Sequence, residues 1–477
     1  MNRTDAPTRA SLSFCFHCTL KKNAIRSLSA LLLCPAVLGF ALVGRADEWP
    51  QWRGNGTGIV EGTPLPTEWG PGKNVAWKVK IPGVAWSSPV VWGDKVFVTT
   101  AVTNNQFKPV PPGKALPGKA PPKVPPKSGS DSNAIYQWGV LCLDRQSGKV
   151  IWKQEALKDK PRITIAPYNT YATETPVTDG ERVYAYFGMH GVYCYDMVGK
   201  LLWKKDLGAF PTKSKHGTAS SPVLDGDRLF LQIDNEEKSF LVALDKKSGE
   251  EVWRVDRDEQ TVYGSPIIWK NKMRTELVTP GSQKVRSYDP ATGRVLWELA
   301  AYGGGCTTTP VADADKLYAL LQGASPNGPG GGQGGLFAVK AGASGDISLK
   351  PGENTNAGIV WSAARPAGSD TSPLVYLGHI YVFSRNGAIL SCYDTATGKQ
   401  VYRERVTGAK NIWASPWGND GKVFILDDSG TTVVLQTGPT FKVLRKNTLD
   451  DTTWATPAAA DGAIYLRGLD YLYCIKS

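Results

Sequence analysis

The chain has 477 residues and a formal net charge of +12, of which the first 46 residues carry about +5. It contains 51 glycines, 33 prolines and 16 tryptophans, and it is longer than one small hydrophobic core requires. Since aromatic residues do not alternate with the basic ones, as they do in grooves for single-stranded nucleic acid, we expect no nucleic-acid partner.

The N-terminal residues 1–46 are typical of a signal peptide for export. Basic residues at 21–26 precede an apolar run at 28–43, and Gly44 and Ala46 suit the small residues of a cleavage site. Cleavage after Ala46 predicts an exported mature chain, periplasmic or extracellular, without a transmembrane segment.

An uncleaved membrane anchor is the alternative for the same apolar run. Pro35 and Gly39 interrupt this run, which barely reaches the length of a membrane-spanning helix. Leu33 stands before Cys34, where a lipid-attachment signal has a small residue. We therefore expect no lipid anchor.

Eight of the Ser-Pro or Thr-Pro pairs in the rest of the chain recur in a regular series, and most of the gaps between them are 41 to 46 residues. A period of this length is typical of a repeat architecture. Each pair precedes a short apolar strand, a turn rich in Gly and Asp, and a second strand, which is the pattern of a β-hairpin. The hydroxyl residues of the pairs are Ser88, Thr175, Ser221, Ser265, Thr309, Ser372, Ser415 and Thr456.

Each repeat continues with a third strand, an acidic turn and a fourth strand that carries an aromatic residue. In residues 288–297 the turn runs from Asp289 to Gly293, and Trp297 follows. Asp can cap the amides of such a turn and Gly can adopt its left-handed residue, so the spacing sets the register of the tryptophan. Four strands in a unit of this length predict one blade of a β-propeller. The fourth strands carry Trp152, Trp203, Trp253, Trp297, Trp361, Tyr402 and Leu444.

These seven fourth strands serve eight repeats, because the chain ends just after the third strand of the last one. A strand at residues 74–79, which contains Trp77, precedes the first repeat and supplies the missing position. We therefore predict an all-β, eight-bladed propeller of four-stranded blades at residues 74–477. The N-terminal strand closes its ring and leaves no free sheet edge. Residues 47–73 form an N-terminal extension.

Two stretches interrupt the period. Residues 104–133 are rich in Pro and Lys and lie between the second and third strands of the first blade, and residues 322–359 of the fifth blade are rich in Gly. We expect both to be surface loops inserted into the propeller. An alternative for 104–133 is a contact with an acidic partner or an anionic membrane.

Five cysteines remain after cleavage, and four of them occupy the same position in the third strands of different repeats. Other repeats place Ala or Ser at this position, so we expect it to need a small side chain that packs. Equivalent positions of separate repeats lie too far apart for disulfides. The four are Cys142, Cys194, Cys392 and Cys474, the other repeats have Ala243, Ser287 and Ala338, and Cys306 is isolated.

The segments just before the Ser-Pro and Thr-Pro pairs are the candidate functional site. In the usual propeller arrangement they gather around one end of the central channel. Several carry aromatic residues, and an aromatic funnel with a few polar groups is typical of small-molecule sites. The alternative is that the aromatic residues only plug and stiffen the channel mouth. The candidates that face the channel are Trp86, Tyr171, Glu174, His216, Tyr263, Asp370, Trp413 and Trp454.

Three features together resemble one known family. They are the Asp-x-x-[Ser/Thr]-Gly-x-x-x-Trp turns at 144–152 and 289–297, the strands that follow Ser-Pro or Thr-Pro, and the segment Trp-Pro-Gln-Trp-Arg-Gly at 49–54. This pattern is similar to the pyrroloquinoline-quinone-like (PQQ-like) repeat β-propeller family, over roughly residues 48–477. The resemblance implies the propeller fold. The family includes quinoprotein alcohol and glucose dehydrogenases as well as scaffolds of outer-membrane assembly.

The resemblance implies PQQ, Ca²⁺, a carboxylate cluster, a catalytic Asp and often an adjacent Cys-Cys disulfide in the enzyme members. No Cys-Cys pair occurs in this chain, and no family catalytic motif can be matched residue by residue. We therefore expect no catalytic residue, no metal and no cofactor. The expected function is that of an exported, monomeric scaffold or binding protein of the cell envelope, whose face contacts a protein, peptide or polysaccharide.

Two catalytic alternatives remain open from the sequence. One is a PQQ-dependent quinoprotein oxidoreductase that uses the central funnel with calcium. The other is a hydrolase-type or cation-binding site built from Glu174, Asp370 and His216. The expected scaffold differs from the assembly scaffolds of the family in lacking their lipid-attachment signal.

Overall fold

The computed structural model describes residues 48–104, 133–300, 307–321, 334–364, 371–384 and 387–477. The predicted signal peptide, nearly all of the insertion at 104–133, Cys306 and Asp370 lie outside the described residues. Across the described ranges, no helix has the length and apolar character needed to span a membrane.

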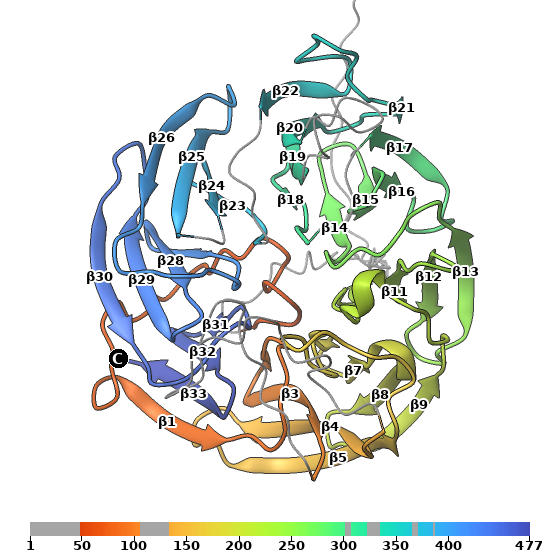
Figure 1. The fold of residues 1–477 in the computed structure, drawn as a ribbon, viewed down its shortest axis with the longest axis vertical. Helices are drawn as coiled ribbons and strands as arrows, with labels where there is room; N and C mark the ends of the chain where they lie inside the picture. Colours follow the sequence, from red (N-terminus) through yellow and green to blue (C-terminus); the bar gives the residue numbers. More distant parts are fainter. Residues whose placement is uncertain (1–47, 105–132, 301–306, 322–333, 365–370, 385–386) are drawn as a thin grey trace, which may run out of the picture. The chain divides into compact units, whose positions relative to one another are not determined.

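Eight antiparallel sheets stand in a ring, which confirms the predicted eight-bladed β-propeller (Figure 1). The first four blades contain β2 (Val90–Trp92), β3 (Lys95–Val102), β4 (Tyr136–Asp144) and β5 (Val150–Asp159); β6 (Val177–Thr178), β7 (Arg182–Tyr186), β8 (Val192–Asp196) and β9 (Leu201–Lys205); β10 (Val223–Asp225), β11 (Arg228–Ile233), β12 (Phe240–Asp245) and β13 (Glu251–Asp256); and β14 (Ile267–Lys270), β15 (Thr275–Thr279), β16 (Lys284–Tyr288) and β17 (Val295–Ala300).

The other four blades complete the ring. They contain β18 (Val311–Ala312), β19 (Lys316–Leu321), β20 (Gly335–Lys340) and β22 (Ile359–Ala364); β23 (Leu374–Tyr376), β24 (His379–Ser384), β25 (Ile389–Asp394) and β26 (Gln400–Arg405); β27 (Trp417–Asn419), β28 (Lys422–Leu426), β29 (Thr431–Gln436) and β30 (Val443–Thr448); and β31 (Ala458–Ala460), β32 (Ala463–Arg467), β33 (Tyr471–Lys476) and β1 (Val75–Lys80). Two short 3₁₀ turns are η1 (Gly188–His190) and η2 (Lys213–Lys215).

Burial follows the position of each strand in its blade. The third strand β12 is buried along almost its whole length, whereas the outer strand β13 alternates between exposed and half-buried residues. Blades pack face to face, so inner strands are covered on both sides and only the outermost strand meets water. The small-residue position of the third strands is filled as predicted: Cys142, Cys194, Cys392 and Cys474 are free thiols and buried.

The ring closes through the N-terminal strand. β1 pairs antiparallel with β33, from Val75 opposite Ile475 to Lys80 opposite Tyr471. The last blade therefore takes its outer strand from the beginning of the chain, as predicted. This pairing covers the edge that β33 would otherwise expose.

Five tryptophans of the outer strands dock on the acidic turn of the next blade. Trp203 Nε1 donates to the carbonyl oxygen of Lys246 at 3.1 Å, and a Cβ added to Gly249 would lie 2.6 Å from Trp203 Cε3. Gly249 has φ +74°, a conformation that glycine adopts without strain. The same bond joins Trp77 to Arg145, Trp152 to Met197, Trp253 to Pro290 and Trp361 to Thr395.

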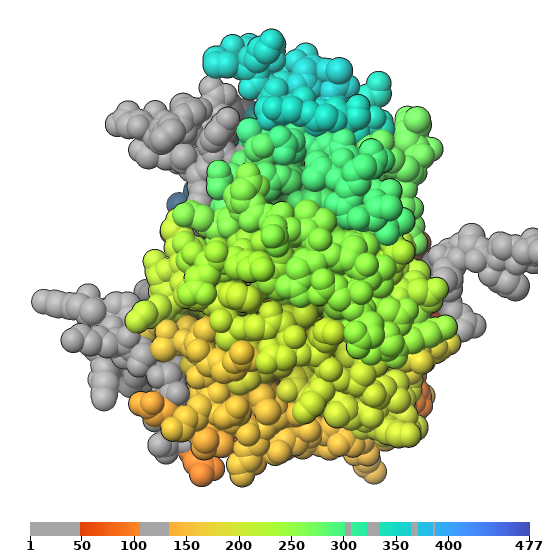
Figure 2. Space-filling view, turned by 90° about the vertical axis from the view of Figure 1, so that its right-hand side faces the viewer, coloured from red at the N-terminus to blue at the C-terminus, as the bar shows by residue number. Residues whose placement is uncertain are grey.

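The predicted loop at 322–359 is wrong in its extent, because it contains two strands. β20 is the third strand of the fifth blade, and β21 (Gly345–Asp346) pairs in parallel with β17 of the fourth blade. Figure 2 shows the cyan residues of this region beside the green residues of the fourth blade. The fifth blade has no acidic turn here, and the indole of Trp297 donates instead to Glu276 Oε2 at 2.7 Å.

The N-terminal extension lies against the innermost strands of the ring. Trp49 pairs with Val91 in the first blade, and Ile59 pairs with Gly418 in the seventh. Between these two pairs the segment crosses the middle of the ring, where Figure 1 shows it in red-orange. The segment therefore lies along the inside of the ring, a position that was not predicted from the sequence.

Candidate functional site

One cavity of about 560 Å³ occupies the channel, and the hydroxyl residues of all eight Ser-Pro and Thr-Pro pairs line it. The residues that mark the repeat in the sequence therefore lie together in the wall of one cavity. Each proline that follows has a fixed φ and no N–H, so it starts the inner strand without an amide that would need a partner.

The hydroxyl groups join each blade to the next. The backbone N–H of Ser88 donates to Thr175 Oγ1 at 3.0 Å, and the backbone N–H of Thr175 donates to Ser221 Oγ at 3.0 Å. A hydroxyl that accepts such a bond keeps its own proton for another acceptor. The series continues from Ser221 to Ser265, Ser265 to Thr309, Thr309 to Ser372, Ser372 to Ser415 and Ser415 to Thr456, at 2.8 to 3.2 Å.

The junction where the last blade meets the first uses a buried arginine. Arg467 Nη1, from β32, donates to the carbonyl oxygen of Thr99 at 2.6 Å and to Ser87 Oγ at 3.3 Å. Burial lowers the pKa of Arg467 to about 9. Its Nε has no hydrogen-bond partner in the described part of the chain.

Aromatic rings cover one side of the cavity. Trp454 stacks with Trp413 at a centroid distance of 4.0 Å and with Trp86 at 5.1 Å. Tyr168 lies next to Trp454, and its ring centroid is 5.6 Å from that of His216. The ring centroid of Tyr263 is 6.0 Å from that of His216. The arc offers ring faces and edges to a ligand over several consecutive blades.

A strained turn brings a lysine to the same cavity. In η2, Ser214 has φ 52° and Lys215 has φ 58°, which L-residues seldom adopt. The backbone N–H of Lys213 donates to Thr261 Oγ1 at 2.8 Å. Both Lys213 and Ser214 line the cavity. Burial, together with the charge of Lys213, lowers the pKa of the neighbouring His216.

The N-terminal segment contributes Trp52 to the cavity wall. The guanidinium of Arg53 lies 5.6 Å from the centroid of the Trp52 ring. Arg53 is fully buried, and its Nη2 donates to the carbonyl oxygen of Thr57 at 2.9 Å. Nε and Nη1 have no partner in the ranges that the structure describes, and burial lowers the pKa of Arg53 to about 9.

Of the eight predicted channel-facing residues, the structure brings five together. Tyr171 and Glu174 are not among them, and Asp370 lies outside the described residues. The five that line the cavity are Trp86, His216, Tyr263, Trp413 and Trp454. Their role in binding stays a prediction.

Tyr171 and Glu174 lie outside the described lining of this cavity. Tyr171 packs in the core against Tyr136 and Trp138, and its hydroxyl donates to the carbonyl oxygen of Ile163 at 3.3 Å. Glu174 is 2% exposed and is not among the residues that line the cavity. Burial raises the pKa of its carboxyl to about 7.

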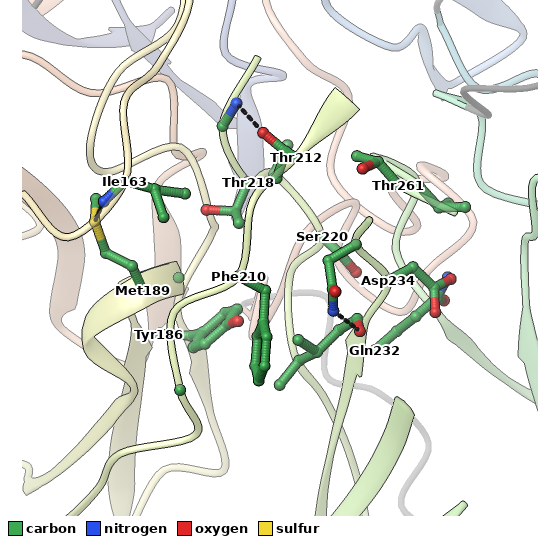
Figure 3. A pocket seen from close by; sticks show the side chains of 17 residues that line it. Ile163, Tyr186, Met189, Phe210, Thr212, Thr218, Ser220, Gln232, Asp234 and Thr261 are labelled. Carbon is green, nitrogen blue, oxygen red and sulfur yellow. Dashed lines mark hydrogen bonds between the residues drawn. The ribbon is translucent and has the colours of Figure 1, made fainter. Parts of the chain in front are cut away.

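A second, small cavity of about 30 Å³ lies behind the wall, between the second and third blades. Figure 3 shows Ser220 and Gln232 on one side of it and Ile163 and Met189 on the other. Ser220 Oγ and Gln232 Oε1 are buried without a partner in the described residues. The volume is large enough for one water molecule.

Sequence reasoning missed three parts of the site. Trp52 belongs to the 49–54 motif, but its place in the wall depends on the distant pairing of Trp49 with Val91. Lys213 lies further before Ser221-Pro222 than His216, the candidate predicted from this segment. The eight hydroxyl residues were recognised in the sequence as markers of the repeat, but they were not predicted to line the cavity.

The described lining offers no carboxylate ligand for the calcium of the enzyme members. Calcium takes six to eight oxygen ligands, usually with carboxylates among them. None of the described lining residues is Asp or Glu, and the Asn169 amide is engaged by His216 and Thr170. Within the described ranges, no group of three or more His, Cys, Asp or Glu residues could hold a metal ion.

Comparison with known proteins agrees with this fold. A family model described as outer membrane protein assembly factor BamB matches residues 138–324. The structure is similar to BamB from Moraxella catarrhalis, at 13% identity and a TM-score of 0.50, over 80% of this chain and 98% of that one. It is also similar to quinohemoprotein alcohol dehydrogenase from Comamonas testosteroni, at 13% identity and a TM-score of 0.55, over 91% of this chain and 81% of that one.

No curated protein matches the sequence. The matched family and the two folds confirm the resemblance to PQQ-like repeat propellers. At this level of identity the similarity concerns the fold, and both a scaffold and an oxidoreductase share it.

Proposed function

We propose that the protein is an exported, non-catalytic binding protein of the cell envelope that holds a saccharide or peptide in its central cavity. The observation that carries the proposal is the cavity itself, in which an arc of aromatic rings faces a ring of hydroxyls. Such a wall supplies stacking surface and hydrogen bonds, which is what recognition requires.

The same wall is poorly suited to acid–base or metal chemistry. A general acid or base needs a titratable group in reach of the substrate. His216 and Lys213 are the titratable groups of the described lining besides the phenols of Tyr168 and Tyr263, and no carboxylate there could orient the imidazole. The backbone carbonyl of His216 accepts from Asn169, which fixes the loop but leaves the ring without a catalytic partner of that kind.

The test is a titration of tryptophan fluorescence with a panel of short oligosaccharides and peptides. Trp86, Trp413 and Trp454 line the cavity, so a bound ligand should change their emission saturably. Trp454→Phe should weaken every binder, because it shortens the stacking surface. Trp253→Phe, on the outside of the propeller, is the matched control. A panel in which nothing binds to the wild type would contradict the proposal.

A PQQ-dependent oxidoreductase is the second candidate, favoured by the similarity of fold to quinohemoprotein alcohol dehydrogenase. Quinone and Ca²⁺ added to the purified protein should then produce a saturable absorbance change and raise the melting temperature. Absence of both changes would remove this candidate and leave the first.

A further inference from the structure

One cation lines the central cavity and two buried arginines lie near it, and none of the three has an acidic partner in the described chain. Lys213 lines the cavity, Arg53 lies behind Trp52, and Arg467 bonds to Ser87, the neighbour of the lining residue Ser88. Both arginines are buried and have guanidinium nitrogens without partners. A buried charge without a counter-ion costs several kcal/mol, and a nearby anion offsets that cost.

The hydrogen-bonding groups of the wall are mostly hydroxyls. At seven junctions a lining hydroxyl accepts a backbone N–H, for example Thr309 from Ser265 and Thr456 from Ser415. Each then has one proton left to donate and one lone pair left to accept. None of the described lining residues is a carboxylate, so none of them repels an anionic ligand.

The turn that presents Lys213 is held under strain. Two consecutive non-glycine residues, Ser214 and Lys215, adopt left-handed conformations, at a cost of about 1–2 kcal/mol each. Bonds from Lys213 N–H to Thr261 and from Gly217 N–H to Thr212 keep the turn in place. Strain that the surroundings maintain at a cavity wall is a feature of binding sites.

We infer that the ligand of the cavity is an acidic saccharide, that is, a short chain of sugar rings that carry carboxylates. This inference rests on the proposed function and specifies its ligand. The C–H faces of sugar rings stack on indoles, here Trp86, Trp413 and Trp454. Sugar hydroxyls and ring oxygens pair with the hydroxyls of the wall, and a carboxylate pairs with Lys213.

A peptide fits the same wall less well. Its backbone brings one N–H donor for nearly every carbonyl, and each buried N–H needs an acceptor. The N-terminal segment, which pairs with Val91 and Gly418, also supplies Trp52 to the wall of this cavity.

The experiment compares short oligogalacturonates with the methyl esters of the same chains, which differ only in the charge of the carboxyl group. The acid form should bind the wild-type protein at least tenfold more tightly, and added salt should weaken it. Lys213→Met should weaken the acid form about 5- to 10-fold and leave the ester unchanged. Lys215→Met is the matched control, since that exposed lysine belongs to the same turn but does not line the cavity.

The outcomes separate this inference from the proposed function. Equal affinity for acid and ester, or binding of peptides in place of saccharides, overturns the inference and leaves a binding protein. No binding of any member of the panel overturns both. Equal losses in Lys213→Met and Lys215→Met would also contradict the assigned role of Lys213.

Discussion

The backbone amide of Ser88 donates to Oγ1 of Thr175 at 3.0 Å, which ties the first blade to the second at the wall of the central cavity. Each of the two residues is only 2% exposed. Six further bonds of the same kind join successive blades. The repeated hydroxyl is therefore a structural requirement of the ring before it is a contact for any ligand.

Removing one such acceptor should lower stability. Thr175→Val keeps the shape of the side chain but leaves the amide of Ser88 buried without a partner. We expect the free energy of unfolding to fall by about 1–3 kcal/mol. Thr175→Ser keeps the acceptor and should lose clearly less. Denaturant unfolding of both variants measures the difference, and equal losses would show that the hydroxyl is not the stabilising group.

The docking of tryptophan on glycine can be tested in the same way. Gly249→Ala places a methyl group 2.6 Å from the ring of Trp203 in a left-handed residue with φ +74°. Gly226 has φ +57°, and a Cβ added there would have no other heavy atom within 4 Å, so Gly226→Ala is the matched control. The second variant should lose about 1–2 kcal/mol from strain alone. The first should lose more, because the indole must move, and urea midpoints compare the two.

The architecture was predictable because its signals are local. A Ser-Pro or Thr-Pro pair, an acidic turn and a tryptophan at a fixed spacing each define a strand boundary, and their repetition gives the number of blades. The orientation of single side chains was not predictable. Thr173 and Thr175 line the cavity, and successive side chains of an extended segment point to opposite sides, so Glu174 between them faces away.

Contacts between segments far apart in the chain also could not be predicted from the sequence. No local pattern shows that Trp52 reaches the cavity, because its position follows from the pairing of Trp49 with Val91. The short strand β21 could not be predicted either, because its two residues follow a Gly-rich stretch and show no strand pattern. They pair because β17 leaves an open edge beside them.

The buried carboxyl of Glu174 should make stability depend on pH. Burial raises its pKa from 4.5 to about 7, so the folded chain binds this proton more tightly than the unfolded chain. Its contribution to stability is thus fully present below about pH 4.5 and is lost as the pH rises through about 7. The loss amounts to roughly 3 kcal/mol at most.

Glu174→Gln removes this titration. Relative to the wild type, the variant should gain stability steadily between pH 4.5 and pH 8, as denaturant unfolding at a series of pH values measures. Glu61→Gln, at an exposed position, is the control and should follow the wild-type curve. A constant difference between Glu174→Gln and the wild type over this range would contradict the assignment.

The side chain of Asn419 fastens the N-terminal segment to the seventh blade. Its Oδ1 accepts the backbone N–H of Leu65 at 2.7 Å, and its Nδ2 donates to the carbonyl oxygen of Val60 at 3.1 Å. Asn419→Ala removes both bonds while the pairing of Ile59 with Gly418 remains. We therefore expect local loosening instead of global unfolding. Hydrogen exchange should speed up about tenfold or more at residues 60–65, since losing the two bonds costs more than about 1.4 kcal/mol.

Asn447→Ala, which frees Trp69 and Thr67 instead, is the matched control, and its effect should lie further along the segment. Unchanged exchange at 60–65 in Asn419→Ala would show that the hydrophobic packing of Val60 and Leu65 holds this segment without the amide.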